Sequence, residues 1–222
     1  TIIGDDIAYL RRIDGKVRAV NVEKGIFGII QDVNPDDDPL IYRALTTPRE
    51  VIFSNILVKD GIPYWLGMGK EPPADGVNFS GDWYQGKKDD RGNEIPFAHP
   101  NARYTIALNE LENADPSIND PAGVEVKGIL YGGRDSDTTV PVGESLTWEH
   151  GVFLGATIES ETTAATIGKK GVRLHNPMAN LDFISVPLDT YLDNHLKFVN
   201  GLSNVPTIFA TNYFLKDDQG KF

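Results

Sequence analysis

Alternating apolar and polar residues flank an Asp-Gly pair at two places in the chain. The first pair is Asp14-Gly15, between residues 9–13 and 16–20, and the second is Asp60-Gly61, between residues 56–59 and 62–66. Asp-Gly suits a two-residue hairpin turn, because both central residues of that turn take a positive φ. The pattern therefore predicts two β-hairpins.

Three further apolar runs predict strands. Val124–Tyr131 is expected to form a strand that ends at Gly132-Gly133, and Ile208–Ala210 a short buried strand. Ile2–Asp6 is first apolar and then acidic, which is typical of a strand that ends in two carboxylates.

Apolar side chains recur at helical spacing towards the end of the chain. They are Leu188, Tyr191, Leu192, Leu196 and Val199, with His195 on the same face. This spacing predicts a helix that stops before Gly201. A second helix is expected within residues 148–161, although Gly151 and Gly155 disfavour it. Because no stretch resembles a long linker, the sequence predicts a single β-rich, mixed-sheet α/β body over residues 1–222.

Composition excludes several classes of protein. The 222 residues include 21 basic and 32 acidic side chains, which give a net charge of −11, and no cysteine. We expect no nucleic-acid partner bound through bulk charge and no anionic membrane partner, since both need a basic surface. Disulfide scaffolds, cysteine-ligated zinc and cysteine nucleophiles are excluded. No apolar run is long enough to span a membrane, and the residues from Thr1 onward lead us to expect no signal peptide.

Two neighbouring carboxylates and two arginines are the candidate chemical groups. Asp5 and Asp6 offer hard oxygen ligands for a divalent metal, although an exposed Asp-Asp turn is the commoner use of such a pair. Arg103, close to Asn101, and Arg134, directly after Gly132-Gly133, are able to bind carboxylate or phosphate bidentately. The alternative for each arginine is a surface ion pair.

Two segments near the end of the chain suggest nucleotide handling. Residues 161–171 are rich in small side chains and glycines, which suits a mobile lid but also an ordinary exposed loop. Tyr213, Phe214 and Phe222 flank a short polar loop, where their rings would stack on a purine or pack in a core.

Taken in order, a series of motifs resembles GTP-dependent phosphoenolpyruvate carboxykinase, in an archaeal-like form. The motifs cover residues 3–8, 18–28, 98–104, 132–134, 148–156, 160–161, 212–214 and 220–222. The match runs the full length of the chain and corresponds to the central to C-terminal portion of that enzyme. The resemblance implies part of the C-terminal nucleotide- and metal-binding domain.

The resemblance also implies a reaction and its ligands. Oxaloacetate would be decarboxylated to an enolate, which takes the γ-phosphoryl group of GTP, giving phosphoenolpyruvate, CO₂ and GDP in gluconeogenesis. Mn²⁺ would be the catalytic metal, and Mg²⁺ or Mn²⁺ would accompany GTP. The parent enzyme would be cytoplasmic.

Individual roles follow from the matched motifs. Asp6 would bind the catalytic Mn²⁺ directly, and Asp5 would serve the nucleotide's metal through water. Asn101 and Arg103 would hold the substrate carboxylate, with Arg103 also facing the transferring phosphoryl group, and Arg134 would neutralise charge on the γ-phosphate. The remaining residues divide between a lid, with Glu161, Thr162, Gly168 and Gly171, and a guanine pocket, with Tyr213, Phe214 and Phe222.

The resemblance places other parts of the active site outside the 222 residues. The N-terminal domain, the phosphate-binding loop and two further Mn²⁺ ligands are expected to precede Thr1, so we expect the chain alone to be inactive. Two alternatives stay open: a non-enzymatic module that binds a nucleotide or another dianion, and an ATP-using kinase that does not decarboxylate.

Overall fold

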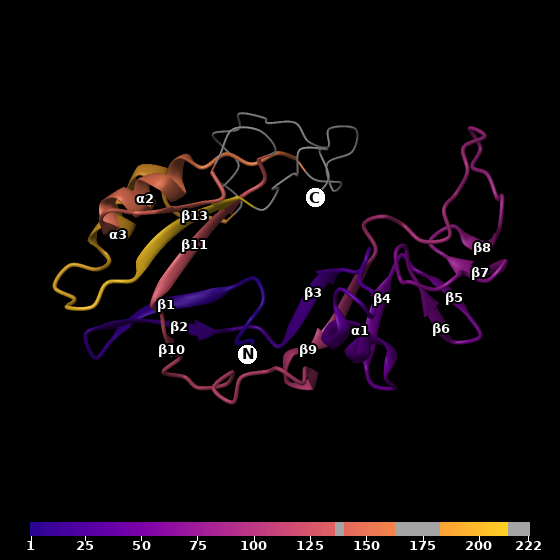
Figure 1. Ribbon diagram of the computed structural model, residues 1–222, viewed down its shortest axis with the longest axis horizontal. Coiled ribbons are helices and arrows are strands. Elements are labelled where there is room, and N and C mark those ends of the chain that lie inside the picture. Colours follow the sequence, from indigo (N-terminus) through magenta and orange to yellow (C-terminus); the bar gives the residue numbers. More distant parts are fainter. Residues whose placement is uncertain (136–139, 163–182, 213–222) are drawn as a thin grey trace. The chain divides into compact units, whose positions relative to one another are not determined.

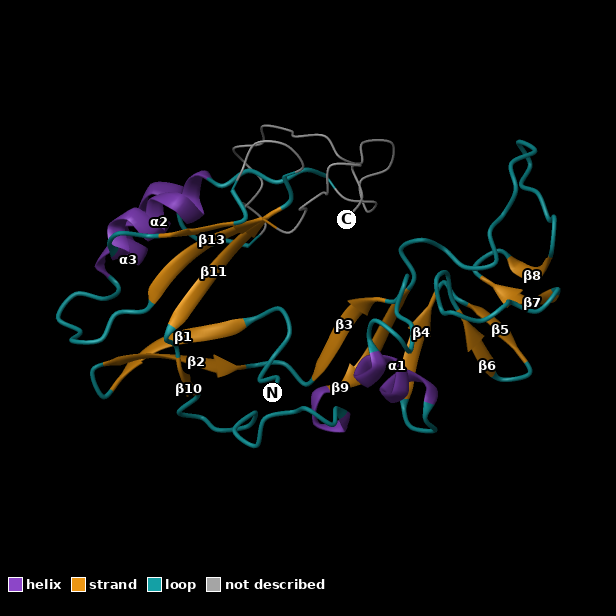
Figure 2. Cartoon of the chain, in the orientation of Figure 1, coloured by secondary structure: helices purple, strands orange, loops and turns teal. Residues whose placement is uncertain are grey.

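The computed structural model describes residues 1–135, 140–162 and 183–212 (Figure 1). In this part of the chain, short strands outnumber helices (Figure 2), which confirms the β-rich, mixed α/β prediction. The chain divides into two compact units. The first comprises residues 1–9 and 21–123, and the second comprises residues 10–20 and 124–222.

The first unit contains two small antiparallel sheets. One has the strand order β3-β9-β4 and the other β6-β5-β7-β8. The elements of this unit are β3 (Gly25–Ile29), α1 (Pro39–Thr46), β4 (Val51–Ser54), β5 (Leu57–Lys59), β6 (Ile62–Tyr64), β7 (Asp75–Asn78), β8 (Gly81–Tyr84), β9 (Arg103–Ala107) and the 3₁₀ helix η1 (Leu108–Glu110).

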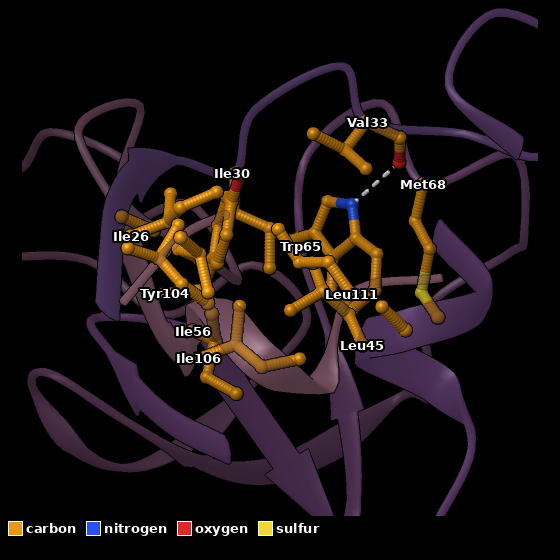
Figure 3. Packing of buried hydrophobic residues seen from close by; sticks show 14 residues of the cluster. Ile26, Ile30, Val33, Leu45, Ile56, Trp65, Met68, Tyr104, Ile106 and Leu111 are labelled. Atoms are coloured by element: carbon orange, nitrogen blue, oxygen red, sulfur yellow. Dashed lines mark hydrogen bonds between the residues drawn. The ribbon is translucent and has the colours of Figure 1, made fainter. Parts of the chain in front are cut away.

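The sheet β3-β9-β4 packs one face against the core of the first unit. Along β9, Tyr104 and Ile106 are buried, whereas Arg103 and Thr105 alternate with them and lie on the opposite face. Figure 3 shows Trp65 within the buried cluster, where its indole N–H donates to the Val33 carbonyl at 2.8 Å. The buried cluster is Ile26, Ile30, Val33, Ala44, Leu45, Ile56, Trp65, Met68, Ala102, Tyr104, Ile106, Leu108, Leu111 and Ile118. The opposite face of this sheet, which carries Arg103 and Thr105, does not pack against this core.

Both predicted hairpins are confirmed. In the first, β1 (Ala8–Ile13) and β2 (Lys16–Asn21) flank Asp14 and Gly15, whose φ angles are 52° and 72°. In the second, β5 and β6 flank Asp60 and Gly61, with φ of 51° and 75°. These positive values are the ones that a type I′ turn requires, which explains the choice of Asp-Gly.

The second unit combines two three-stranded sheets with two helices. The strand orders are β1-β2-β10 and β11-β13-β12, and β11 runs parallel to β13. Besides β1 and β2, the elements are β10 (Val124–Glu125), β11 (Gly128–Gly133), β12 (Val142–Glu144), α2 (Trp148–Thr157), α3 (Leu188–Lys197) and β13 (Thr207–Asn212).

Both predicted helices are present. The helix α2 begins after Thr147, whose hydroxyl accepts the His150 N–H at 3.1 Å as an N-cap, and it ends at Thr157, earlier than predicted. The helix α3 contacts α2 through the Trp148 indole, which donates to the His195 carbonyl at 2.7 Å. Among the helices that the structure describes, none combines the length and the apolar character needed to cross a membrane.

The glycines of α2 have a packing function. A Cβ atom at Gly151 would lie 2.4 Å from a methyl carbon of Ile208 on β13, and one at Gly155 would lie 2.5 Å from the Tyr131 ring on β11. Such distances are far inside van der Waals contact, so only glycine lets the helix approach this sheet so closely. Glycine has a low helix propensity, but close packing of α2 on the sheet requires glycine at these two positions.

We expect Gly151→Ala to destabilise the chain by about 1–3 kcal/mol, because the new methyl group overpacks against Ile208. Chemical denaturation of the 222-residue chain measures this loss. Gly143→Ala on β12 is the matched control, since no atom lies within 4 Å of a Cβ placed there. Equal stability of the two variants would contradict the packing seen between α2 and β13.

Two strand predictions were wrong. Ile2–Asp6 is not a strand: Ile2 forms only an isolated bridge with Ala114, and Asp5 and Asp6 lie in a bend. Val124–Tyr131 is interrupted after Glu125, because β10 pairs with β2 whereas β11 pairs with β13. The strand β11 ends at Gly132-Gly133 as predicted, with both glycines as its last residues.

Candidate functional site

The Asp5-Asp6 bend is held by a carboxylate from further along the chain. The backbone N–H groups of Asp5 and Asp6 both donate to Oε2 of Glu23, at 2.9 and 2.7 Å. Burial raises the pKa of the Glu23 carboxyl, but the N–H groups of Ile7, Asp5 and Asp6 outweigh that effect and hold the pKa below its usual value. Glu23 therefore accepts these hydrogen bonds as a carboxylate.

The Asp5 side chain joins this bend to the sheet β3-β9-β4. Its Oδ2 accepts the backbone N–H of Phe27, on β3, at 2.9 Å. Burial first, and then the charges of Asp5 and Asp38, raise the pKa of Tyr104 on the adjacent strand β9, so its phenol stays protonated. The Asp5 carboxylate is thus fixed at the β3 edge of the sheet.

Arg103 lies beside this bend on the open face of the sheet. Its guanidinium carbon is 5.0 Å from the centre of the Phe27 ring, a cation–π distance, and its Nε donates to Oδ1 of Asn101 at 3.1 Å. Phe27 is 60% exposed and Ile52, on the same face of β4, is 64% exposed, so the guanidinium is open to a ligand.

Asn101 is itself placed by a tight turn before β9. Its backbone N–H donates to Nδ1 of His99 at 3.0 Å, and the Ala102 N–H donates to the His99 carbonyl at 2.9 Å. Within the described residues, the two terminal amino groups of Arg103 make no hydrogen bond. With Nε engaged by Asn101, these groups are available to bind a carboxylate or phosphate.

Arg134 follows β11 in the second unit and contacts the start of the predicted lid. Its backbone N–H donates to the Ser160 hydroxyl at 3.1 Å, and its Nε donates to the Glu161 carbonyl at 2.8 Å. The Glu161 N–H returns a bond to the Arg134 carbonyl at 2.8 Å. Gly133 permits this contact, since a Cβ there would lie 2.6 Å from the carbonyl oxygen of Glu159.

The structure accounts for some of the predicted site residues and leaves others open. Asp5, Asp6, Asn101 and Arg103 gather in the first unit, and Arg134, Glu161 and Thr162 are described in the second. Five predicted residues lie outside the described part of the chain: Gly168, Gly171, Tyr213, Phe214 and Phe222.

Asp5 and Asp6 fit a divalent cation as a partial donor set. Within the described ranges, no other group hydrogen-bonds to the Asp6 carboxylate or to the second oxygen of Asp5. Carboxylate oxygens are hard ligands of the kind that Mn²⁺ and Mg²⁺ accept. No cluster of three or more His, Asp or Glu side chains able to hold a metal occurs among the described residues, so two carboxylates are what this part of the chain offers.

The sequence matches a known protein family over its full length. Residues 1–222 match the family described as the phosphoenolpyruvate carboxykinase C-terminal P-loop domain, and the chain belongs to that family. The family resemblance predicted from the ordered motifs is therefore confirmed.

Curated relatives identify the nucleotide in their names. The chain is 56% identical over 219 residues to "Phosphoenolpyruvate carboxykinase [GTP]" of Thermococcus kodakarensis and 55% identical over 219 residues to that of Pyrococcus abyssi. Each match covers 98% of this chain and 35% of the relative. The protein of the same name from Chlamydia trachomatis is 37% identical over 223 residues, covering 99% of the chain and 36% of the relative. The chain thus spans about a third of the length of these relatives.

Sequence reasoning assigned no role to Glu23 or to the Phe27 ring. Both lie in a matched motif, but the chain offered no local pattern that links Glu23 to Asp5 and Asp6. The contact joins residues 17 and 18 positions apart through a bend, not through paired strands.

Proposed function

We propose that these 222 residues act within a longer enzyme that converts oxaloacetate and GTP into phosphoenolpyruvate, CO₂ and GDP. They would form part of its C-terminal nucleotide- and metal-binding domain, in a cytoplasmic, gluconeogenic enzyme. The observation that carries the proposal is that Phe27 contacts both Asp5, through its N–H, and Arg103, through its ring. A carboxylate able to bind a metal and an arginine able to bind an anion therefore meet at one sheet. Family membership and the names of the relatives support it.

Arg103 and Asn101 would bind and orient the substrate carboxylate. Because Nε of Arg103 is engaged by Asn101 and its plane rests near the Phe27 ring, the guanidinium is held before substrate arrives. A pre-oriented fork loses less freedom on binding than a mobile lysine would. Decarboxylation breaks a C–C bond and leaves its electron pair on the enolate, whose oxygen then forms a bond to the γ-phosphorus as the bond to GDP breaks.

Asp6 would bind the catalytic Mn²⁺ directly, and Asp5 would serve the Mg²⁺ or Mn²⁺ of the nucleotide through water. Such a cation supplies Lewis-acid stabilisation of negative charge that develops on oxygen. The contribution of the chain is to hold the two carboxylates, and the Glu23 and Phe27 contacts are what hold them.

Arg134 would neutralise charge on the γ-phosphate. Its contacts with Ser160 and Glu161 tie the arginine to the start of the lid. Closure of the lid, residues 162–173 with Gly168 and Gly171, would exclude water from the phosphoryl group and protons from the enolate. Tyr213, Phe214 and Phe222 would line the guanine pocket.

Simultaneous measurement of CO₂ release and phosphoenolpyruvate formation by the full-length enzyme tests this proposal. We expect equal amounts of both products from oxaloacetate with GTP, and much less with ATP. Phosphorylation with ATP and without CO₂ release would favour a kinase. Binding of GTP without any turnover, together with Mn²⁺ affinity that Asp6→Ala leaves unchanged, would favour a non-enzymatic binding module.

A further inference from the structure

We propose that Glu23 is a positioning residue that holds the Asp5-Asp6 bend in its cation-binding conformation without itself binding the cation. The inference rests on the proposed function, because it takes Asp5 and Asp6 to be the carboxylates that serve the metals. Its direct support is the convergence of the Asp5 and Asp6 N–H groups on a single Glu23 oxygen, at 2.9 and 2.7 Å.

Successive N–H groups that point to one spot make a concave anion-binding site. Here the anion is supplied by the chain itself, so the peptide planes on both sides of Asp5 are fixed by one carboxylate. The directions in which the two aspartate side chains leave the backbone are fixed with them, because each Cβ is attached to a held peptide unit. A metal site needs this kind of prior order, since its ligands lose affinity when their supports are removed.

The Asp5 carboxylate keeps one oxygen for a cation. Among the described residues, the one hydrogen bond to the Asp5 carboxylate is donated by the Phe27 N–H to Oδ2, so Oδ1 is left for a cation or its water.

The position of Glu23 is determined by Asn21, at the end of β2. The side chain of Asn21 brackets the Glu23 backbone: its Oδ1 accepts the Glu23 N–H and its Nδ2 donates to the Glu23 carbonyl, both at 2.9 Å. Gly4 packs onto the same amide, since a Cβ there would lie 2.9 Å from Asn21 Oδ1. The segment that contains Gly4 is thereby kept next to the residue that holds the bend.

The same short segment supports both halves of the proposed site. Glu23 holds the Asp5-Asp6 bend, and Phe27, four residues later, donates to Asp5 and lies against Arg103. A change at Glu23 should therefore weaken binding of the cation more than binding of the substrate carboxylate. This difference distinguishes positioning of the metal ligands from a general loss of structure, which would weaken both.

Titration of the full-length enzyme with Mn²⁺, followed by the electron paramagnetic resonance signal of the free ion, tests the inference without relying on activity. We expect Glu23→Ala to weaken Mn²⁺ binding about 10- to 100-fold, the usual cost of removing a residue that supports a metal ligand. Glu23→Gln keeps an acceptor oxygen at the same reach and should stay within about threefold of wild type. Glu71→Ala is the matched control, because Glu71 is exposed and makes no hydrogen bond within the described residues.

Each outcome separates this inference from the proposed function. If Asp6→Ala weakens Mn²⁺ binding but Glu23→Ala does not, only the role of Glu23 is overturned. Loss of affinity in Glu23→Gln equal to that of Asp6→Ala would make Glu23 a ligand, and would also overturn the inference. An Asp6→Ala variant with unchanged affinity would refute the proposed metal site itself. Should Glu23→Ala fail to fold, Glu23→Asp keeps the charge but withdraws the acceptor by one methylene, and we then expect weakened binding from that variant.

Discussion

Replacement of Arg103 by alanine in the full-length enzyme is expected to lower kcat/KM for oxaloacetate by about 100- to 1,000-fold, the usual cost of removing one preorganised donor to developing charge. The guanidinium is held by the Phe27 ring and by Asn101, and its terminal amino groups are open on the exposed face of the sheet. Without it, the substrate carboxylate loses a charged, bidentate partner. Steady-state kinetics with varied oxaloacetate measure the effect.

Two further variants test the reason for that loss. Arg103→Lys keeps the positive charge but not the planar fork, so we expect activity between those of wild type and Arg103→Ala. Arg91→Ala removes an arginine from an exposed turn of the same unit and should leave the kinetics unchanged. Retention of kcat/KM within about threefold in Arg103→Ala would show that Arg103 does not bind the substrate.

The second large effect is expected at Asp6. We expect Asp6→Ala to lower kcat by about 1,000-fold or more, because Lewis-acid stabilisation contributes several kcal/mol and each 1.36 kcal/mol is a factor of ten in rate. Raising the Mn²⁺ concentration should recover only part of the rate, since a ligand is missing. Turnover measured as a function of Mn²⁺ concentration provides both numbers.

The control for Asp6 is another exposed aspartate of the same unit. The Asp36 carboxylate makes no hydrogen bond within the described residues, so Asp36→Ala removes the same charge without touching the bend. Its Mn²⁺ dependence should match that of wild type. If the two variants behave alike, the effect of Asp6 is one of general charge and not of metal binding.

Local patterns predicted the parts of the fold that local physics decides. The hairpins at Asp14-Gly15 and Asp60-Gly61 follow from turn residues that accept a positive φ. The helix α3 follows from apolar spacing that needs no knowledge of what it packs against. The motif order, together with the residues within each motif, was enough to indicate the family.

Arrangements that depend on distant pairing could not be predicted from local patterns. The sheet β3-β9-β4 joins strands separated by long stretches of chain, and it is this pairing that places Arg103 next to Phe27. Ile2–Asp6 has the composition of a strand, but Ile2 finds only one partner, Ala114, so no strand forms. The role of Glu23 is of the same kind, because an acidic residue after a strand has many possible partners.

The most direct test is a ³¹P NMR time course of GTP and oxaloacetate with the full-length enzyme and Mn²⁺, in which each sample is quenched and the paramagnetic ion is removed on a chelating resin before the spectrum is recorded. We expect the γ-phosphate signal to disappear as signals of phosphoenolpyruvate and GDP grow equally, and both Asp6→Ala and Arg103→Ala to slow this conversion strongly. GTP that stays unchanged, or that yields inorganic phosphate without phosphoenolpyruvate, would contradict the proposed function.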